Sequence, residues 1–262
     1  MKITDFERKK SKNSKISMLT CYDYPSAKIV SESNVDCVLV GDSVAMTVHG
    51  YNSTMFATMD MMVMHTSAVA RGLKNQFLVA DLPFLSYRED MKTTINNVKM
   101  LLQAGAHAVK LEGADATLCK TINYLVNSGI SVMGHIGLTP QSYIQLGGYK
   151  VQGKTEEAAQ LLLNQAQSLQ DAGCFAIVIE CVPEALATQI TNSLKIPTIG
   201  IGAGKNTDGQ VMVWHDILGI QSEMNLKFVK QYVNCKDSIL NAINIYANDV
   251  QKMLFPSLEH SF

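Results

Sequence analysis

The sequence predicts a single (β/α)8 barrel of the TIM type over residues 1–262, with a short N-terminal helix and a C-terminal helical tail. Three observations predict this fold. Strand-like and helix-like segments alternate along the chain, which is typical of a parallel sheet with right-handed crossovers. The alternation repeats about eight times, as a closed barrel requires. Several apolar segments also end in an ionisable residue, as expected where barrel strands deliver side chains to one active site.

The eight predicted strands are short and mostly continuous in apolar residues, which is typical of strands buried on both faces. They comprise residues 16–23, 37–42, 77–83, 108–113, 130–137, 176–182, 197–204 and 210–218. The last of these segments could instead be a strand followed by a short helix.

Segments with helical periodicity separate the strands, and an amphipathic helix is expected near the C-terminus. The predicted helices comprise residues 24–33, 59–71, 90–104, 117–127, 155–173, 183–194 and 236–254. In the clearest of them, Thr155 can cap the first turn, Glu156 and Glu157 suit its positive end, and Gly173 can end it.

Two long connections, 43–58 and 138–154, follow the second and fifth strands. Loops at this end of a barrel often carry substrate contacts or lids, although an insertion without a role is the alternative.

The composition excludes several classes of protein. The formal net charge of −1 argues against nucleic-acid binding, and no apolar run is long enough to cross a membrane. The basic N-terminal residues precede no apolar segment of a secretory signal. The six cysteines form no CxxC pair, so we expect free thiols in a reducing cytoplasm.

Three carboxylates at strand ends form a candidate metal site. Asp42, Asp81 and Glu112 end the second, third and fourth strands, and adjacent strands lie about 4.8 Å apart. All-oxygen ligation favours Mg²⁺ or Mn²⁺ over Zn²⁺. Each carboxylate taken alone could instead pair with a lysine or arginine.

Further candidates surround this group. Lys110 lies two residues before Glu112, so both side chains face the same side of the strand, and its ammonium could bind a substrate carboxylate or Glu112 itself. Ser43 offers a hydroxyl and a backbone N–H. Glu180 ends the sixth strand, across the barrel, and is the candidate general base; a structural hydrogen bond to the next loop is the alternative. His135 ends the fifth strand and could bind substrate, relay a proton or be structural.

These residue types suit the chemistry of a 2-oxo acid. Its keto and carboxylate oxygens can chelate a divalent cation, which stabilises the enolate formed when a base removes the neighbouring proton. The residues alone predict no more than this.

The chain also resembles the ketopantoate hydroxymethyltransferase family, within the phosphoenolpyruvate mutase and isocitrate lyase-like barrels. The resemblance covers almost the full length. It rests on the stretches TCYDYPSAK (20–28), VGDS (40–43), MTVHGYNST (46–54), ADLPF (80–84), VKLEG (109–113), GHIGLTPQS (134–142), GGYKVQGK (147–154), IECVP (179–183), PTIGIGAG (197–204) and EHSF (259–262).

The resemblance implies a role for each candidate. Asp42, Asp81 and Glu112 would hold Mg²⁺, directly or through water, and Ser43 and Lys110, together with the two aspartates, would contact 3-methyl-2-oxobutanoate. Glu180 would accept the proton from C3, assisted by His135. The implied one-carbon donor is 5,10-methylenetetrahydrofolate and the product is 2-dehydropantoate, in pantothenate and coenzyme A synthesis. Members are cytoplasmic homo-oligomers, often decamers built as a pentamer of dimers.

Three other functions are weighed against this one. Another Mg²⁺-dependent 2-oxo acid lyase or mutase of the same superfamily is the first alternative, and substrate profiling would separate the two. A barrel that only binds a metabolite is the second. A glycosidase with two carboxylates is the third, but its sugar cleft needs aromatic residues and this chain has one tryptophan.

Overall fold

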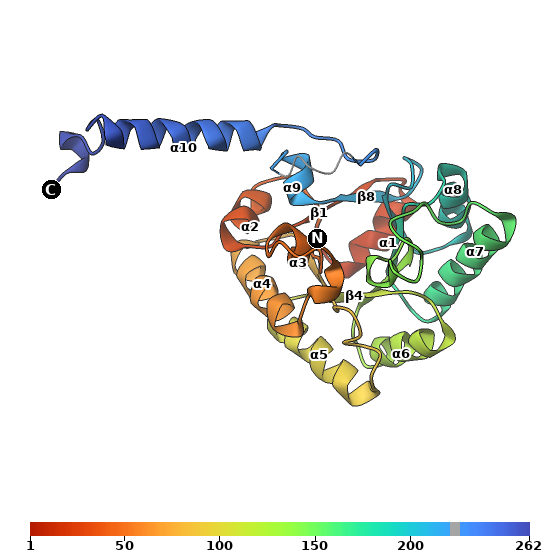
Figure 1. Cartoon of the computed structure of the whole chain (residues 1–262). Coiled ribbons are helices and arrows are strands. Elements are labelled where there is room, and N and C mark those ends of the chain that lie inside the picture. The colour runs from red at the N-terminus through yellow and green to blue at the C-terminus, as the bar shows by residue number, and fades with distance from the viewer. Residues whose placement is uncertain (221–225) are drawn as a thin grey trace. The chain divides into compact units, whose positions relative to one another are not determined.

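The computed structural model describes residues 1–220 and 226–262, in two compact units, Met1–Met212 and Val213–Phe262. In the first unit, eight parallel strands close into a barrel in chain order (Figure 1), which confirms the predicted fold class. The strands are β1 (Ile16–Thr20), β2 (Cys37–Val40), β3 (Phe77–Asp81), β4 (Ala108–Glu112), β5 (Val132–Gly137), β6 (Ala176–Glu180), β7 (Thr198–Ile201) and β8 (Gly209–Met212). The prediction of one domain over 1–262 stays a prediction.

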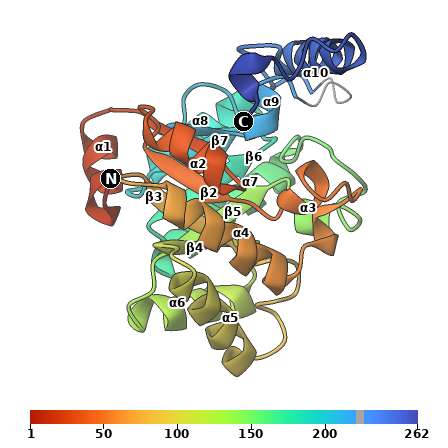
Figure 2. The same cartoon turned by 90° about the vertical axis from the view of Figure 1, so that its left-hand side faces the viewer.

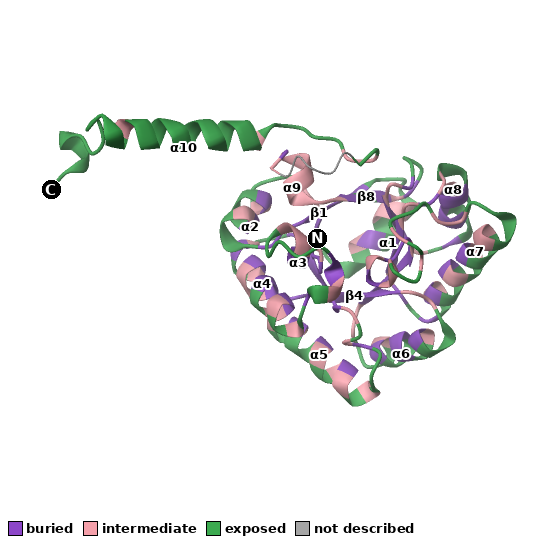
Figure 3. Ribbon diagram, in the orientation of Figure 1, coloured by how far each residue is buried: buried purple, intermediate pink, exposed green. Residues whose placement is uncertain are grey.

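Helices surround the barrel of the first unit, as the views in Figures 1 and 2 show. They are α2 (Tyr24–Ser31), α4 (Met59–Gly72), α5 (Met91–Gln103), α6 (Ala116–Asn127), α7 (Glu156–Asp171) and α8 (Glu184–Ser193). Each buries the stripe that faces the strands and exposes the other (Figure 3). The short helices α3 (Val44–Thr47), η1 (Thr54–Phe56) and η2 (Pro140–Ser142) lie in the two long connections.

The helix ends follow the predicted capping residues. The Thr155 hydroxyl accepts a hydrogen bond from the backbone N–H of Ala158 at 3.2 Å, and Gly173 adopts a φ of 99° just beyond α7. Asp90 and Asp115 cap α5 and α6 in the same way. A side-chain acceptor satisfies one of the N–H groups that the first turn of a helix leaves unpaired.

The inward face of the barrel changes from apolar to charged along strands β3 to β6. Because side chains alternate between the two faces of a strand, every second residue points to the axis. On β3 this series is Phe77, Val79 and then Asp81, and on β6 it is Ala176, Val178 and then Glu180. The apolar members join one buried cluster. The charged members therefore lie at the C-terminal strand ends, above a packed floor.

The N-terminal helix α1 (Ile3–Ser11) closes the opposite end of the barrel. Phe6 is 1% exposed. Its ring meets those of Phe77 and Phe175 edge to face, with centroids 5.2 and 4.9 Å away. Aromatic edge contacts of this kind add to the stability gained by burial, so α1 is part of the core.

The second unit contains the short helix α9 (Trp214–Ile217), the long helix α10 (Cys235–Gln251) and η3 (Leu258–His260). The predicted C-terminal helix is thus confirmed, and so is the reading of 210–218 as a strand followed by a short helix. In the described residues, no helix has the length and apolar character needed to cross a membrane.

Candidate active site

Five of the predicted site residues form a buried charged layer at the C-terminal strand ends. Asp42, Asp81, Lys110, Glu112 and His135 are all less than 5% exposed. In the strand register Asp81 lies opposite Lys110, and Glu112 lies opposite His135. Neighbouring strands therefore bring the acidic and basic side chains together in pairs, as the sequence predicts for a barrel.

The Lys110 ammonium lies at the centre of this layer. Its Nζ is 3.1 Å from Asp81 Oδ1 and 3.7 Å from Glu112 Oε1, so the alternative that Lys110 pairs with Glu112 is realised, with Asp81 added. Burial favours loss of the proton, but the surrounding carboxylates outweigh it and raise the pKa of Lys110. The lysine is thus a fixed positive charge next to the substrate space.

Asp42 lies two residues beyond β2 and forms no ion pair within the described residues. Its backbone N–H donates to Asp81 Oδ2 at 3.1 Å, and its own Oδ2 accepts from the Gln141 side-chain amide at 2.8 Å. Burial, followed by repulsion from Asp81 and Glu112, raises the pKa of Asp42 well above its ordinary value. This carboxylate has the least compensation in the layer.

The pKa values of the other two carboxylates move in opposite directions. Burial raises the pKa of Asp81, and the Lys110 charge only partly offsets it. Burial also opposes ionisation of Glu112, but His135 and Lys110 lower its pKa overall. Glu112 is therefore an ionised carboxylate in the folded protein, while the two aspartates are left short of positive charge.

His135 connects the acidic layer to Glu180. Its Nδ1 is 3.2 Å from Glu112 Oε1, and its Nε2 is 3.1 Å from Glu180 Oε2. Burial and the nearby Lys110 oppose protonation, but the two carboxylates raise the pKa of His135 to about 9. The imidazolium form then makes an ion pair with Glu112. Nδ1 also lies 3.1 Å from Lys110 Nζ, so it accepts a hydrogen bond from the ammonium when the ring is neutral and faces Glu112 with its proton when the ring is charged.

The Glu180 side chain is 15% exposed, more than any other acidic group of the site, so it faces the open mouth. Close contact between β5 and β6 holds its backbone. The N–H of Leu138 donates to the Glu180 carbonyl at 2.9 Å. A Cβ at Gly137, where φ is 92°, would collide with the same oxygen. The tight approach of the two strands explains why this position is glycine.

Ser43 follows Asp42, and a hydrogen bond of 2.8 Å joins its Oγ to the Tyr22 hydroxyl. Tyr22 is 1% exposed, and burial raises the pKa of its phenol to about 12. A neutral, buried phenol thus fixes the orientation of the serine hydroxyl at the edge of the charged layer.

Besides Tyr22, two residues of the site were missed by sequence reasoning. Gln141, at the start of the loop after β5, bridges two carboxylates: its backbone N–H donates to Glu112 Oε2 at 3.0 Å and its side chain donates to Asp42. The Tyr87 hydroxyl donates to Gln141 Oε1 at 2.7 Å. Gln141 lies within the family stretch GHIGLTPQS, which was the only available signal, because loop side chains follow no periodicity.

The charge balance of the layer fits a divalent cation. Three carboxylates face one ammonium and one imidazolium, and Asp81 Oδ1 and Glu112 Oε1 are buried without a well-aligned hydrogen bond from the described residues. In those residues, however, no three His, Cys, Asp or Glu side chains are arranged to hold one ion together. The oxygen donors themselves are of the type that Mg²⁺ takes, since it usually keeps several waters and binds one or two carboxylates directly.

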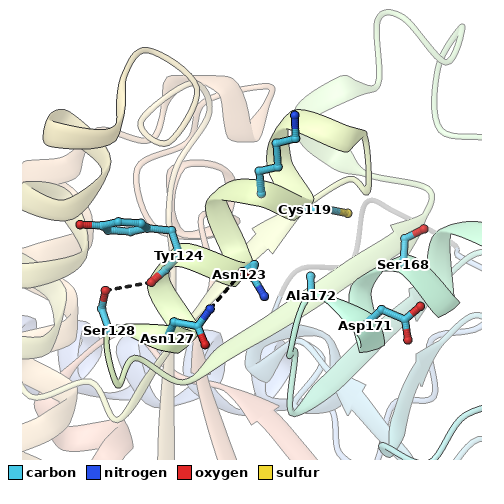
Figure 4. Close-up of a pocket in the computed structure, with 9 residues that line it drawn as sticks. Cys119, Asn123, Tyr124, Asn127, Ser128, Ser168, Asp171 and Ala172 are labelled. Carbon is cyan, nitrogen blue, oxygen red and sulfur yellow. Dashed lines mark hydrogen bonds between the residues drawn. The ribbon is translucent and has the colours of Figure 1, made fainter.

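A separate hollow of about 790 Å³ lies between α6 and α7 on the outside of the barrel (Figure 4). Its lining includes Tyr124 from α6 and Asp171 from α7. None of the charged residues at the strand ends belongs to it, so it is distinct from the candidate site.

The fold and the charged layer define an α/β-barrel enzyme that acts on a small anionic molecule. A family model described as ketopantoate hydroxymethyltransferase matches residues 1–258, and the chain belongs to this family. It is 65% identical over 262 residues to the 3-methyl-2-oxobutanoate hydroxymethyltransferase of Legionella pneumophila (strain Lens), covering 100% of both chains. It is 52% identical over 259 residues to that of Coxiella burnetii (strain CbuK_Q154), covering 99% of this chain and 97% of the relative.

Solved structures share the fold at low sequence identity. A 2,3-dimethylmalate lyase of the PEP mutase/isocitrate lyase superfamily matches with a TM-score of 0.61 and 14% identity, covering 99% of this chain and 90% of the other. A phosphonopyruvate hydrolase in complex with oxalate and Mg²⁺ matches with a TM-score of 0.62 and 12% identity, covering 99% and 93%. These likenesses bear on the fold alone, and they agree with the predicted barrel.

Proposed function

We propose that the chain transfers a hydroxymethyl group from 5,10-methylenetetrahydrofolate to C3 of 3-methyl-2-oxobutanoate, giving 2-dehydropantoate in pantothenate biosynthesis, in a reaction that depends on Mg²⁺. Membership of the family gives the activity and implies the folate cosubstrate. The observation that carries the mechanism is the buried acidic layer with a single lysine at its centre, joined through His135 to a carboxylate at the mouth.

Asp42, Asp81 and Glu112 would hold the Mg²⁺, directly or through water. When bound, the ion supplies a positive charge that polarises the 2-oxo group and makes the C3 proton more acidic. The surplus negative charge of the layer supports this assignment, as do its two buried oxygens without a well-aligned donor.

The other residues position the substrate. Lys110 offers a fixed ammonium to the substrate carboxylate, and its burial excludes water that would weaken this attraction. Ser43 offers a hydroxyl whose direction is set by Tyr22, and the neighbouring Asp42 and Asp81 contact each other at 3.1 Å. We assign these four residues to 3-methyl-2-oxobutanoate binding.

Glu180 is assigned as the base that removes the C3 proton, and His135 holds its carboxylate from the side of the acidic layer. C3 then forms a bond to the methylene carbon of the donor, whose bonds to the folate nitrogens break. One water supplies the hydroxyl group, and its remaining proton and the proton held by Glu180 go to the two released nitrogens. The substrate thus loses one proton and gains one hydroxymethyl group.

The test follows the C3 proton of 3-methyl-2-oxobutanoate by NMR in D₂O, with Mg²⁺ or EDTA and with or without methylenetetrahydrofolate. We expect metal-dependent exchange without folate and a new hydroxymethyl signal only with folate. Glu180→Gln should slow both the C3 exchange and the formation of the hydroxymethyl product by at least about a hundredfold, the usual contribution of a general base. Exchange without product would indicate a related lyase or mutase, and absence of both from folded, metal-loaded protein would refute the enolate mechanism.

We further propose that the protein is a cytoplasmic homo-oligomer, a decamer in the family pattern. All six cysteines are free thiols, which supports a reducing compartment. Ile239, Ile243, Tyr246 and Val250 recur at spacings of four and three along α10, a pattern that favours packing against another helix. Sedimentation velocity tests the assembly, since a monomer of 28.7 kDa and a decamer separate widely.

A further inference from the structure

The loop between β5 and α7 is attached at both ends to groups of the active site. Near its start, the Gln141 backbone N–H donates to Glu112 Oε2 at 3.0 Å. Near its end, the Gln152 N–H donates at 2.8 Å to the carbonyl of Cys181, the residue after Glu180. The intervening residues therefore run from the acidic side of the mouth to the side of the base.

This segment presents a flat aromatic surface. The rings of Tyr143 and Tyr149 stack with centroids 5.2 Å apart and planes 10° from parallel. The N–H of Gly148 donates to the Tyr143 carbonyl at 2.8 Å, and Gly147 and Gly148 adopt φ values of 72° and 104°. Positive φ at two successive glycines allows the tight turn that brings the two tyrosines together.

The stacked pair Tyr143–Tyr149, called the platform below, is both accessible and close to the catalytic groups. Tyr149 is 50% exposed, so a second flat ring can stack on it. Burial and the neighbouring Tyr143 raise the pKa of Tyr149, and the charges of Glu180, Asp42 and Glu112 add to the rise. The tyrosine thus lies within electrostatic reach of both sides of the site.

Two cations follow the platform in the same loop. Lys150 and Lys154 are exposed, and neither ammonium forms an ion pair within the residues that the structure describes. The loop therefore offers an aromatic surface next to unpaired positive charge. That combination suits a ligand with a flat heteroaromatic ring and a carboxylate tail, because such rings stack on aromatic side chains and carboxylates pair with lysine.

We propose that the Tyr143–Tyr149 pair is the docking surface for the pterin ring of the folate donor, and that Lys150 and Lys154 bind its glutamate carboxylates. This inference rests on the proposed function, which requires a tetrahydrofolate at the mouth. It places the one-carbon unit between the loop and the acidic layer, facing the carbon that Glu180 deprotonates.

A second stacked pair competes for this role. Tyr51 and Phe56, in the connection after β2, stack with centroids 5.1 Å apart and planes 13° from parallel. No lysine or arginine occurs in that connection, residues 43–58, so it lacks the charge that a glutamate tail requires. The same measurements on Tyr51→Leu therefore separate the two platforms.

The experiment measures tetrahydrofolate binding by calorimetry and the KM for methylenetetrahydrofolate in Tyr149→Leu. Loss of one stacking surface should raise the dissociation constant of tetrahydrofolate and the KM for methylenetetrahydrofolate by about five- to thirtyfold. Tyr149→Phe, which keeps the ring, should bring both constants back to within about threefold of wild type. The KM for 3-methyl-2-oxobutanoate and the folate-independent C3 exchange should stay within about twofold of wild type. The matched control is Tyr124→Leu, also 50% exposed but in the outer hollow (Figure 4), and it should change nothing.

The charged part is tested with the double variant Lys150→Gln, Lys154→Gln. It should lose more affinity for tetrahydropteroyl triglutamate than for the monoglutamate, and its binding should depend less on salt. Unchanged tetrahydrofolate binding in Tyr149→Leu, or a loss that occurs in Tyr51→Leu instead, overturns the inference. Failure of the proposed function is distinguishable, because C3 exchange would then be absent from the wild type itself.

Discussion

Replacing Gln141 with methionine tests whether this loop residue holds the acidic layer in place. Methionine has nearly the same length, but it removes an amide that donates to Asp42 Oδ2 at 2.8 Å and to the Leu82 carbonyl at 3.0 Å. Both acceptors are buried, and a buried polar group left without its partner costs about 1–3 kcal/mol. We therefore expect the metal-free protein to lose roughly 2–6 kcal/mol of unfolding free energy.

The same change should weaken metal binding. An outer partner that orients a ligating carboxylate is typically worth about 10- to 100-fold in metal affinity, so the Mg²⁺ dissociation constant should rise by that factor in calorimetry. Urea unfolding in EDTA measures the stability. The control is Gln152→Met in the same loop. Among the described residues, the Gln152 side chain donates to the exposed Lys150 carbonyl, so this change should alter the free energy of unfolding by less than about 0.5 kcal/mol. Wild-type stability and Mg²⁺ affinity in Gln141→Met would refute the reasoning.

Two further predictions concern charge. Lys110→Met removes the cation beside Asp81 and Glu112, which should lower the free energy of unfolding in EDTA by about 3–5 kcal/mol. In urea unfolding, Mg²⁺ should restore part of this stability. An equal loss with and without Mg²⁺ would contradict the charge balance. The second prediction concerns Asp36, which accepts hydrogen bonds from Lys9 Nζ at 2.8 Å and from the Ser17 N–H at 2.9 Å. Burial opposes ionisation of Asp36, but these donors lower its pKa overall. A carboxyl group whose pKa is lowered by folding stabilises the protein at pH values above its unfolded-state pKa. This stabilisation is lost as the pH falls through the folded-state pKa. Asp36→Asn should therefore lose about 1–3 kcal/mol at pH 7 and approach wild type below about pH 3; a pH-independent difference would exclude this linkage.

The fold was predictable from the eightfold alternation of strand and helix segments, and the charged layer from the ionisable residues at the strand ends. Once a strand is buried on both faces, the position of Asp81 or Glu180 at its end fixes the face that the side chain joins. Parallel pairing then brings Glu112 beside His135. No knowledge of distant contacts is needed for this step, so the five strand residues could be named in this way, while Asp42 and Ser43 were named because they follow the second strand.

The supporting residues could not be predicted in this way. Gln141 and Tyr87 lie in connections, where side-chain direction depends on the turns that the backbone makes. Tyr22 follows β1, and its contact with Ser43 joins two different strand ends. Such contacts depend on the distance between loops after the barrel has closed, which no local pattern encodes. The resemblance to a family supplied the only sequence signal for Gln141.

The charge balance explains why substrate, metal and loop act on one another. With Lys110 shared between Asp81 and Glu112, Asp42 has only the neutral amide of Gln141 as its side-chain partner among the described residues. A cation that compensates Asp42 therefore also strengthens the attachment of the loop that Gln141 begins. That loop carries Tyr149 and its neighbouring lysines. Folate binding should consequently be tighter when Mg²⁺ and the keto acid are already in place, because the carboxylates that hold the Gln141 end of the loop are then compensated.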